Sequence, residues 1–355
     1  KGVEKREVGG TEAENATYFF IRKKGQFIYG KQNLHKGAFG LIPDELDGFE
    51  SSQDIPAFDF KNGYYPQYFV YYLGQENVYP DLEKISTGTG SKRIHPRDLF
   101  QVKFPFPKTE EQQKIAACLS SLDDVITAES KKLEVLKEHK KGLLQNLFPQ
   151  EGETVPKLRF KEFENSGEWE ETTLTHVADY ENGKAHEQDI TDDGDYIVVN
   201  SKFISSDGEV KKFTNTAFCP AQKGDILMVL SDVPNGKAIA KCFLVEEEDR
   251  YTVNQRVCRI TPRNLNSKIL YYLLNRNPFF LAFDDGVKQT NLRKEDVLNC
   301  PLLIPSDPKE QQKIADTLSS LDDLINAQSQ KIETLKLHKK GLLQGLFPDV
   351  NEHNG

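Results

Sequence analysis

Two long segments of the chain repeat one pattern of apolar and polar positions. In residues 111–149 the apolar residues alternate at spacings of four and three, beginning with Ile115, Leu119, Leu122 and Ile126. This spacing predicts an amphipathic α-helix with a coiled-coil seam.

The second segment, residues 310–348, repeats the first at an offset of 199 residues, and 29 of 39 positions are identical. Both copies interrupt the apolar seam at equivalent places, Glu129 and Lys140 in the first and Gln328 and Lys339 in the second. The chain is therefore an internal duplication.

Start signals precede both predicted helices. Thr109 with Gln112 predicts a capping box, and Asp307 with Glu310 predicts another. Two arrangements of the helices are open, an intramolecular antiparallel pair and a homo-oligomeric coiled coil. We favour the intramolecular pair because both copies lie in one chain.

Each predicted helix follows a globular module, and the modules differ in sequence although their helices do not. In the second module, β-rich runs at 196–199, 225–230 and 257–260 mix with a helical stretch near 267–275. The expected fold class is α+β, with two mixed α/β modules separated by two long antiparallel helices and an internal pseudo-twofold repeat. The expected divisions are 1–107 (first module), 108–149 (first spacer helix), 150–156 (connector), 157–305 (second module), 306–348 (second spacer helix) and 349–355 (tail).

The repeat offset places the start of the first module about 42 residues before Lys1, by comparison with a second module that starts near Val155. We therefore expect the first module to be incomplete at its N-terminus. We expect the helix pair to act as a rigid spacer between the two modules. Four residues inserted after the first helix, in the connector at 150–154, are expected to lengthen this spacing without changing what either module recognises.

Composition narrows the possible classes. The net charge of −9 argues against a broadly basic surface for nucleic acid and leaves only local basic loops. No apolar run approaches the ~20 residues of a membrane span, and no signal peptide is evident. Five cysteines without a C-x-x-C motif predict free thiols in a reducing cytoplasm.

Two polar loops recur in both modules. Residues 231–237 match 31–37, and residues 286–293 roughly match 88–95. Lys, Arg, Gln and Asn side chains bond phosphates and base edges, so these loops, with Lys184 and His186 nearby, predict DNA contacts. The candidate DNA-binding residues are Lys31, Gln32, Asn33, His35, Lys36, Ser91, Lys92, Arg93, Lys184, His186, Ser231, Asn235, Lys237, Lys288, Gln289, Thr290, Asn291 and Arg293.

Signs of catalysis are absent from the sequence. The run from Asn277 to Phe280 (N-P-F-F) lacks the second proline of the adenine-methyltransferase motif, and no Gly-rich cofactor loop accompanies it. The acidic pairs at 123–124 and 322–323 lie beside the helix seam, where a structural role is expected. We therefore expect no catalytic, cofactor-binding or metal-binding residue.

The repeated motifs carry a family resemblance. They are a Pro-rich entry to E-Q-Q-K-I-A, the L-x-x-L-D-D helix start and the close L-K-x-H-K-K-G-L-L-Q-x-L-F-P, each present twice. With V-P-K-L-R-F at 155–160, the chain resembles the specificity subunits of Type I restriction-modification enzymes.

The resemblance implies two target-recognition domains that each read half of a split double-stranded DNA site. It implies two methyltransferase subunits that bind S-adenosylmethionine, restriction subunits that use ATP and Mg, and a bacterial or archaeal cytoplasm without membrane attachment. Three alternatives stay open: a stand-alone DNA methyltransferase, a coiled-coil adaptor, and a partnerless DNA-binding decoy.

Overall fold

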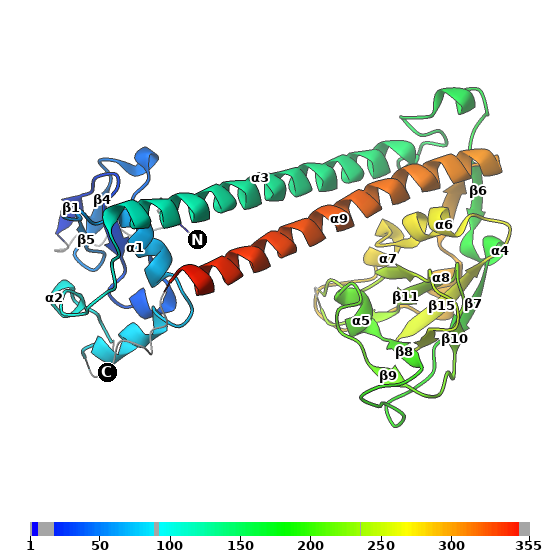
Figure 1. Cartoon of the computed structure of the whole chain (residues 1–355). Coiled ribbons are helices and arrows are strands. Elements are labelled where there is room, and N and C mark those ends of the chain that lie inside the picture. Colours follow the sequence, from blue (N-terminus) through cyan, green and yellow to red (C-terminus); the bar gives the residue numbers. More distant parts are fainter. Residues whose placement is uncertain (1, 6–17, 89–91, 235, 348–355) are drawn as a thin grey trace. The chain divides into compact units, whose positions relative to one another are not determined.

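The computed structural model of the chain describes residues 2–5, 18–88, 92–234 and 236–347 (Figure 1). Backbone contacts divide the chain into two compact units. Unit 1 comprises Lys1–Leu133 with Ala327–Gly355, and unit 2 comprises Glu134–Asn326. The boundaries fall inside the two long helices, so each helix contributes one part to each unit.

Both predicted spacer helices are present as 39-residue helices, α3 (Thr109–Leu147) and α9 (Pro308–Leu346). In unit 1 Asp123 of α3 binds Lys339 of α9 at 2.5 Å, and Glu129 accepts a 2.6 Å hydrogen bond from Gln328. Later residues of α3 thus contact earlier residues of α9, which shows that the two helices run antiparallel there. The polar interruptions of the seam thus contact the other helix of the same chain. The intramolecular pair is the arrangement observed.

The first predicted capping box is wrong. Thr109 Oγ1 donates to the Gly63 carbonyl at 2.9 Å instead of accepting from the helix. Gln112 is 1% exposed, and its side-chain amide donates to Pro107 O at 2.7 Å and accepts from Tyr65 N at 2.8 Å. The glutamine therefore joins the helix to its module, which a local sequence signal does not reveal.

The second predicted box is half present. Asp307 Oδ1 accepts from Lys309 N at 2.8 Å and caps α9. Glu310 instead forms a two-bond pair with Arg159, with both contacts at 2.7 Å. Their side chains are only 1% and 7% exposed, so this ion pair fixes the start of the second module against α9.

The described residues of unit 2 form two four-stranded sheets and two short strand pairs. The first sheet is antiparallel in the order β13 (Cys242–Leu244), β11 (Ile226–Val229), β15 (Val257–Pro262), β7 (Ala178–Asn182). The second has the order β10 (Pro220–Ala221), β14 (Tyr251–Val253), β8 (Tyr196–Val199), β9 (Phe213–Thr214), with β14 and β8 parallel. The pairs are β17 (Pro301–Ile304) with β6 (Glu170–Thr173), and β12 (Ser231–Asp232) with β16 (Thr290–Asn291).

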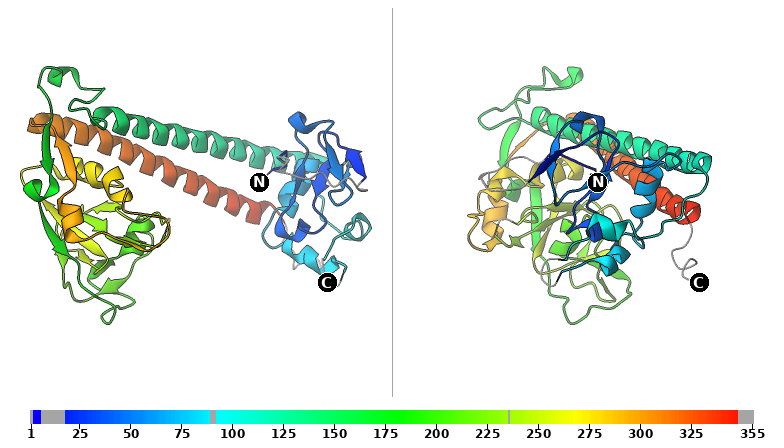
Figure 2. Two further views of the ribbon diagram at one scale, coloured as in Figure 1. Left: turned by 180° about the vertical axis from the view of Figure 1, so that it is seen from behind. Right: turned by 90° about the vertical axis from the view of Figure 1, so that its left-hand side faces the viewer.

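Strand β11 is buried on both faces, which explains its unbroken apolar sequence. Ile226 and Met228 belong to a core shared with α9, and Leu227 and Val229 belong to a second core beneath the other sheet. Helix α6 (Ser267–Leu274) lies between the first sheet and α9 (Figures 1 and 2). The remaining helices of unit 2 are η4 (Lys161–Phe163), α4 (Leu174–Val177), α5 (Ser201–Ser205), α7 (Pro278–Leu281) and α8 (Lys294–Leu298).

Unit 1 has a smaller sheet in the order β3 (Phe39–Leu41), β2 (Phe27–Tyr29), β5 (Ala57–Phe58). The order matches β13, β11 and β15 of unit 2, so β5 corresponds to β15. In unit 2 the strand β7 lies beside β15, but among the described residues of unit 1 no strand lies at the equivalent edge of β5. An aromatic core fills the unit, where Tyr68 packs on Phe347 at 5.2 Å between ring centroids. The other elements are β1 (Phe19–Ile21), β4 (Glu50–Ser52), α1 (Pro66–Leu73), α2 (Pro96–Leu99), η1 (Leu34–Lys36), η2 (Asp44–Leu46) and η3 (Pro80–Ile85).

The connector after α3 lies wholly within unit 2. Phe148 packs on Trp169 at 5.9 Å, and Leu158 N donates to Asn146 O at 2.8 Å. Leu147 is 1% exposed in the core of unit 2. The connector therefore belongs to unit 2 and does not lie at the boundary between the two units.

The five cysteines are free thiols, and only Cys118 is exposed. Within the part of the chain that the structure describes, no helix is long and apolar enough to cross a membrane.

Candidate nucleic-acid interface

One end of the first sheet of unit 2 gathers four polar segments. Strand register places Asn182 opposite Cys258 and Val229 opposite Val257. Hence the segments that follow β7 and β11, and the turn that precedes β15, leave the sheet at the same end. We call residues 183–187, 231–234, 236–237, 254–256 and 286–293 the loop cluster.

The two loops predicted from the repeat meet in this cluster. Strands β12 and β16 form an antiparallel ribbon in which Ser231 lies opposite Asn291 and Asp232 opposite Thr290. The sequence suggested each loop separately, and the structure shows that they form one surface feature.

A close backbone approach holds the Lys184 segment in the cluster. Lys184 N donates to Val253 O at 2.9 Å, and Lys184 pairs with Asn254 in a parallel bridge. A Cβ atom at Gly183 would lie 2.1 Å from Asn254 O, so only glycine fits there.

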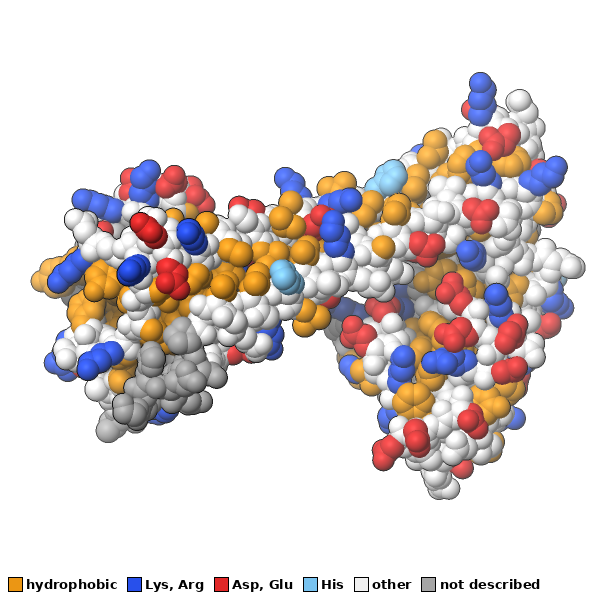
Figure 3. Space-filling model, in the orientation of Figure 1, with side chains coloured by type: hydrophobic (Ala, Val, Ile, Leu, Met, Phe, Trp, Pro, Cys, Tyr) orange, Lys and Arg blue, Asp and Glu red, His pale blue; other side chains and the backbone are white. Residues whose placement is uncertain are grey.

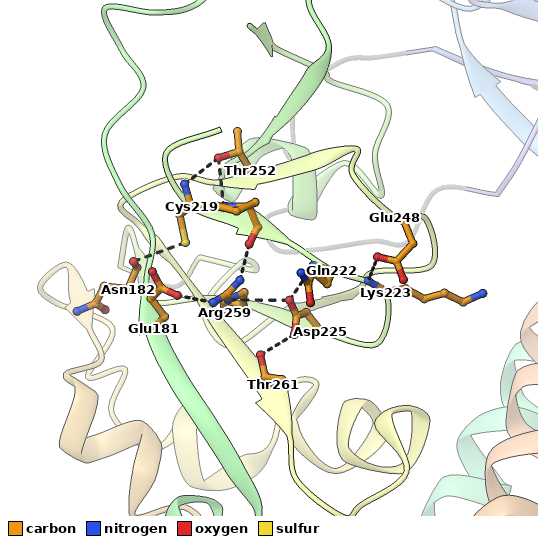
Figure 4. Close-up of polar contacts among 11 residues, drawn as sticks. Glu181, Asn182, Cys219, Gln222, Lys223, Asp225, Glu248, Thr252, Arg259 and Thr261 are labelled. Carbon is orange, nitrogen blue, oxygen red and sulfur yellow. Dashed lines mark hydrogen bonds and ion pairs between the residues drawn. The ribbon is translucent and has the colours of Figure 1, made fainter. Parts of the chain in front are cut away.

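Arg259 cross-links the sheet that supports the cluster (Figure 4). Its guanidinium pairs with Glu181 of β7 and lies 3.9 Å from Asp225, whose other oxygen accepts from Thr261 at 2.6 Å. This network fixes β7, β15 and the start of β11 to one another.

Aspartates in the cluster shape its loops. The Asp232 carboxylate accepts hydrogen bonds from Val233 N at 2.9 Å and Ala238 N at 2.6 Å. Asp285 accepts from Lys288 N at 2.9 Å, which lowers the pKa of its carboxyl group. Asp favours such turns because its side chain reaches nearby backbone amides. These two negative charges are therefore directed at the backbone.

Most of the predicted contact residues of unit 2 are exposed. None of the exposed cations among them forms an ion pair with the described residues. Unpaired cations next to amide side chains provide the donors that bind phosphates and base edges. The exposed predicted residues are Lys184, Lys237, Lys288, Gln289, Asn291 and Arg293.

His186 is a correction to the predicted set. Its side chain is fully buried, its Nδ1 donates to Lys184 O at 2.7 Å, and its Nε2 lies 2.9 Å from Thr252 Oγ1. The imidazole supports the loop and is not presented to a ligand.

Ser231 and Thr290 are also buried, at 8% and 5% exposure, because they form the ribbon. Thr290 Oγ1 donates to Asp284 Oδ1 at 3.1 Å. Their predicted direct contact with DNA is corrected to a supporting role. Asn235 and Ser91 lie outside the described residues.

Unit 1 repeats the junction between its two loops. Ile94 N donates to Lys31 O at 2.8 Å, and the equivalent bond in unit 2 joins Leu292 N to Leu230 O at 2.8 Å. The repeat relation between the loops thus extends to their backbone contacts.

The cations of unit 1 are more engaged than those of unit 2. Lys31 and Arg93 lie 3.9 Å and 3.6 Å from the Asp54 carboxylate. Lys92 binds Glu83 at 2.8 Å and lowers the pKa of that carboxyl group. His35 is half-buried, and the exposed predicted residues without an ion pair among the described residues are Gln32, Asn33 and Lys36.

The surface carries both signs of charge. On the face seen in Figure 3, Lys and Arg side chains are interspersed with Asp and Glu side chains. That face therefore shows no broad basic surface.

The motif at Asn277 is structural. Asn277 Oδ1 accepts from Phe279 N at 2.9 Å and caps α7, and Phe280 is fully buried. Within the described ranges no group of three or more His, Cys, Asp or Glu side chains is suited to a metal.

Each unit thus joins the duplicated helices to a module whose two recurring loops are in contact. The family model for the Type I restriction modification DNA specificity domain matches residues 10–138 and 166–337, and the chain belongs to this family. Among its relatives is the Type I restriction enzyme MjaVIII specificity subunit of Methanocaldococcus jannaschii. It is 28% identical over 290 residues, which cover 75% of this chain and 66% of the relative. The chain thus spans slightly less than two thirds of that relative's length.

Solved structures share the fold. The S subunit of a Type I restriction-modification system from M. genitalium matches 93% of this chain and 85% of its own, with a TM-score of 0.62 and 15% identity. A chain from a structure of the type I R-M system, solved to explain complex assembly and conformational transition, matches 92% and 82% with a TM-score of 0.57 and 17% identity.

Proposed function

We propose that the chain reads a split double-stranded DNA site for a Type I restriction-modification complex, with one half-site bound by each unit. The loop cluster of unit 2 is the observation that carries this proposal. It joins two loops that recur in both halves of the chain, and its cations have no carboxylate partner among the described residues.

The chain acts without chemistry of its own in this proposal. Two methyltransferase subunits bind S-adenosylmethionine and methylate the DNA, and restriction subunits use ATP and Mg. The near-identical helices favour this arrangement because a duplicated surface suits two copies of one partner.

A module exchange tests the proposal. Residues 157–305 are replaced by the recognition module of another family member, and the chain is expressed with its methyltransferase subunits. Sequencing of methylated DNA should show one half of the recognised motif changed and the other half unchanged. A change in both halves would contradict one unit per half-site, and methylation by the chain without partners would contradict its non-catalytic role.

A further inference from the structure

The turn between β14 and β15, residues 254–256, lies at the centre of the loop cluster. Strand β15 lies between β11, which leads into the ribbon, and β7, which leads into the Lys184 segment. Leu230 N donates to Arg256 O at 2.9 Å on one side, and Asn254 pairs with Lys184 on the other. The turn is therefore flanked by both groups of predicted contact residues.

The backbone of this turn is held firmly. Asn254 is 8% exposed and its N–H donates to Val199 O at 3.0 Å, while Val257 N donates to Asn254 O at 2.9 Å. Gln255 Nε2 donates to Glu187 Oε1 at 3.0 Å, so the neighbouring side chain is anchored as well. The backbone that carries the Arg256 side chain is therefore ordered before any ligand binds, which reduces the entropy cost of binding.

Arg256 stands out among the arginines of unit 2. Four of the others form ion pairs. The distance between the paired atoms is 2.7 Å for Arg159, 3.2 Å for Arg250 and 3.6 Å for Arg263, and Arg259 pairs with Glu181. Arg276 Nη1 donates to Ile239 O at 3.0 Å. The exposed Arg256 guanidinium has neither kind of contact with the described residues. Besides Arg256, Arg276 and Arg293 also lack an ion pair with the described residues, and of these two Arg293 lies in the loop cluster.

We propose that Arg256 is a specificity-determining residue that reads a base edge at the centre of the half-site bound by unit 2. The guanidinium fork matches the O6 and N7 acceptors of guanine in the major groove. The inference rests on the proposed function, and it assigns a base contact to a turn outside the two recurring loops.

The test compares Arg256→Ala, Arg256→Lys and the control Arg263→Ala, each assembled with the methyltransferase subunits. Arg263 lies beyond β15 at the opposite end of the sheet, beside Asp179, so the control removes the same charge from outside the cluster. Affinity is measured for the recognised site and for every single-base-pair variant of that half-site. Thermal unfolding of each variant confirms that it folds.

Arg256→Ala should lower affinity for the recognised site about 10- to 100-fold and abolish discrimination at one base pair. Arg256→Lys should lose the same discrimination while it retains more affinity, because lysine keeps the charge without the fork. Arg263→Ala should match the unchanged protein. An equal loss on all sequences, or no loss, would overturn the base contact. If the unchanged complex does not discriminate between sites, the proposed function itself fails.

Discussion

Asp232 places a negative charge in a cluster that we propose binds DNA. Its carboxylate faces the backbone amides of Val233 and Ala238, so it organises the loop that carries Lys237. Buried His186 and Thr290 act in the same way. At the scale of single residues, we therefore expect a polar side chain of the loop cluster either to hold a loop or to contact DNA.

We predict that Asp232→Ala weakens DNA binding although it removes a charge that repels phosphate. Loss of hydrogen bonds to a carboxylate should lower the free energy of unfolding by about 2 kcal/mol. Chemical denaturation and DNA titration measure the two effects. Exposed Asp192 provides the matched control, and tighter binding by Asp232→Ala would refute the structural role.

Thiol reactivity tests the packing of the sheets. Burial raises the pKa of the Cys219 thiol to about 11, and Cys242, Cys258 and Cys300 are also buried. An alkylating reagent at pH 8 should therefore modify Cys118 alone in the native chain and all five thiols after unfolding. Mass spectrometry counts the labels, and fast native labelling of a second cysteine would contradict this packing.

At the scale of elements, each module is tied to the helix pair by one cluster of side chains, and the two clusters are equivalent. In unit 2, Asp322 of α9 accepts from Tyr272 of α6 at 2.7 Å and binds Lys140 of α3, whose ammonium lies 5.4 Å from the Tyr272 ring centre. In unit 1, Asp123, Tyr71 and Lys339 repeat this arrangement. Burial raises the pKa of the Tyr272 hydroxyl, and the hydrogen bond to the Asp322 carboxylate raises it further.

We predict strong coupling between Lys140 and Asp322. Lys140→Asp and Asp322→Lys should each destabilise the chain, because each leaves two like charges side by side. The double variant should recover about 1 kcal/mol or more of the combined loss. Urea unfolding of the unchanged chain, the two single variants and the double variant measures the coupling. The control is the same set of variants with Lys141→Asp, at an exposed position, in place of Lys140→Asp. Strict additivity would show that the pair does not fix the helix register.

The elements also show how far the sequence alone reaches. The heptad pattern predicted both long helices and their polar interruptions, because helical periodicity is local. The pattern did not reveal that Tyr272 contacts Lys140, the polar residue on the seam of α3, because the two residues are far apart in the sequence. The repeat identified two loops, but the strand register that joins them as a ribbon depends on the folded sheet. For the same reason Arg256 carries no sequence signal of its own.

At the scale of the whole molecule, each long helix begins in the core of one unit and ends in the core of the other. Ile115 of α3 packs in unit 1 and Leu147 in unit 2, and Ile314 and Leu346 of α9 show the reverse order. We infer that the helices between these anchored ends, not the connector, determine the gap between half-sites.

We therefore predict that one heptad inserted into both helices lengthens the recognised gap. The insertions follow Leu133 in α3 and Asn326 in α9, at the boundaries of the two units. Seven residues add about 10.5 Å of helix and preserve the apolar seam. That length corresponds to about three base pairs at ~3.4 Å per base pair, with both half-sites unchanged.

Sequencing of methylated DNA from cells that express each variant gives the result. Insertion into α3 alone should abolish methylation, because it breaks the register with α9. Four residues inserted between Glu151 and Gly152 should leave the gap unchanged, because Leu147 before them and Trp169 after them both pack in unit 2. A gap that the double insertion does not alter would mean that partner subunits, which clamp the DNA independently of these helices, set the spacing.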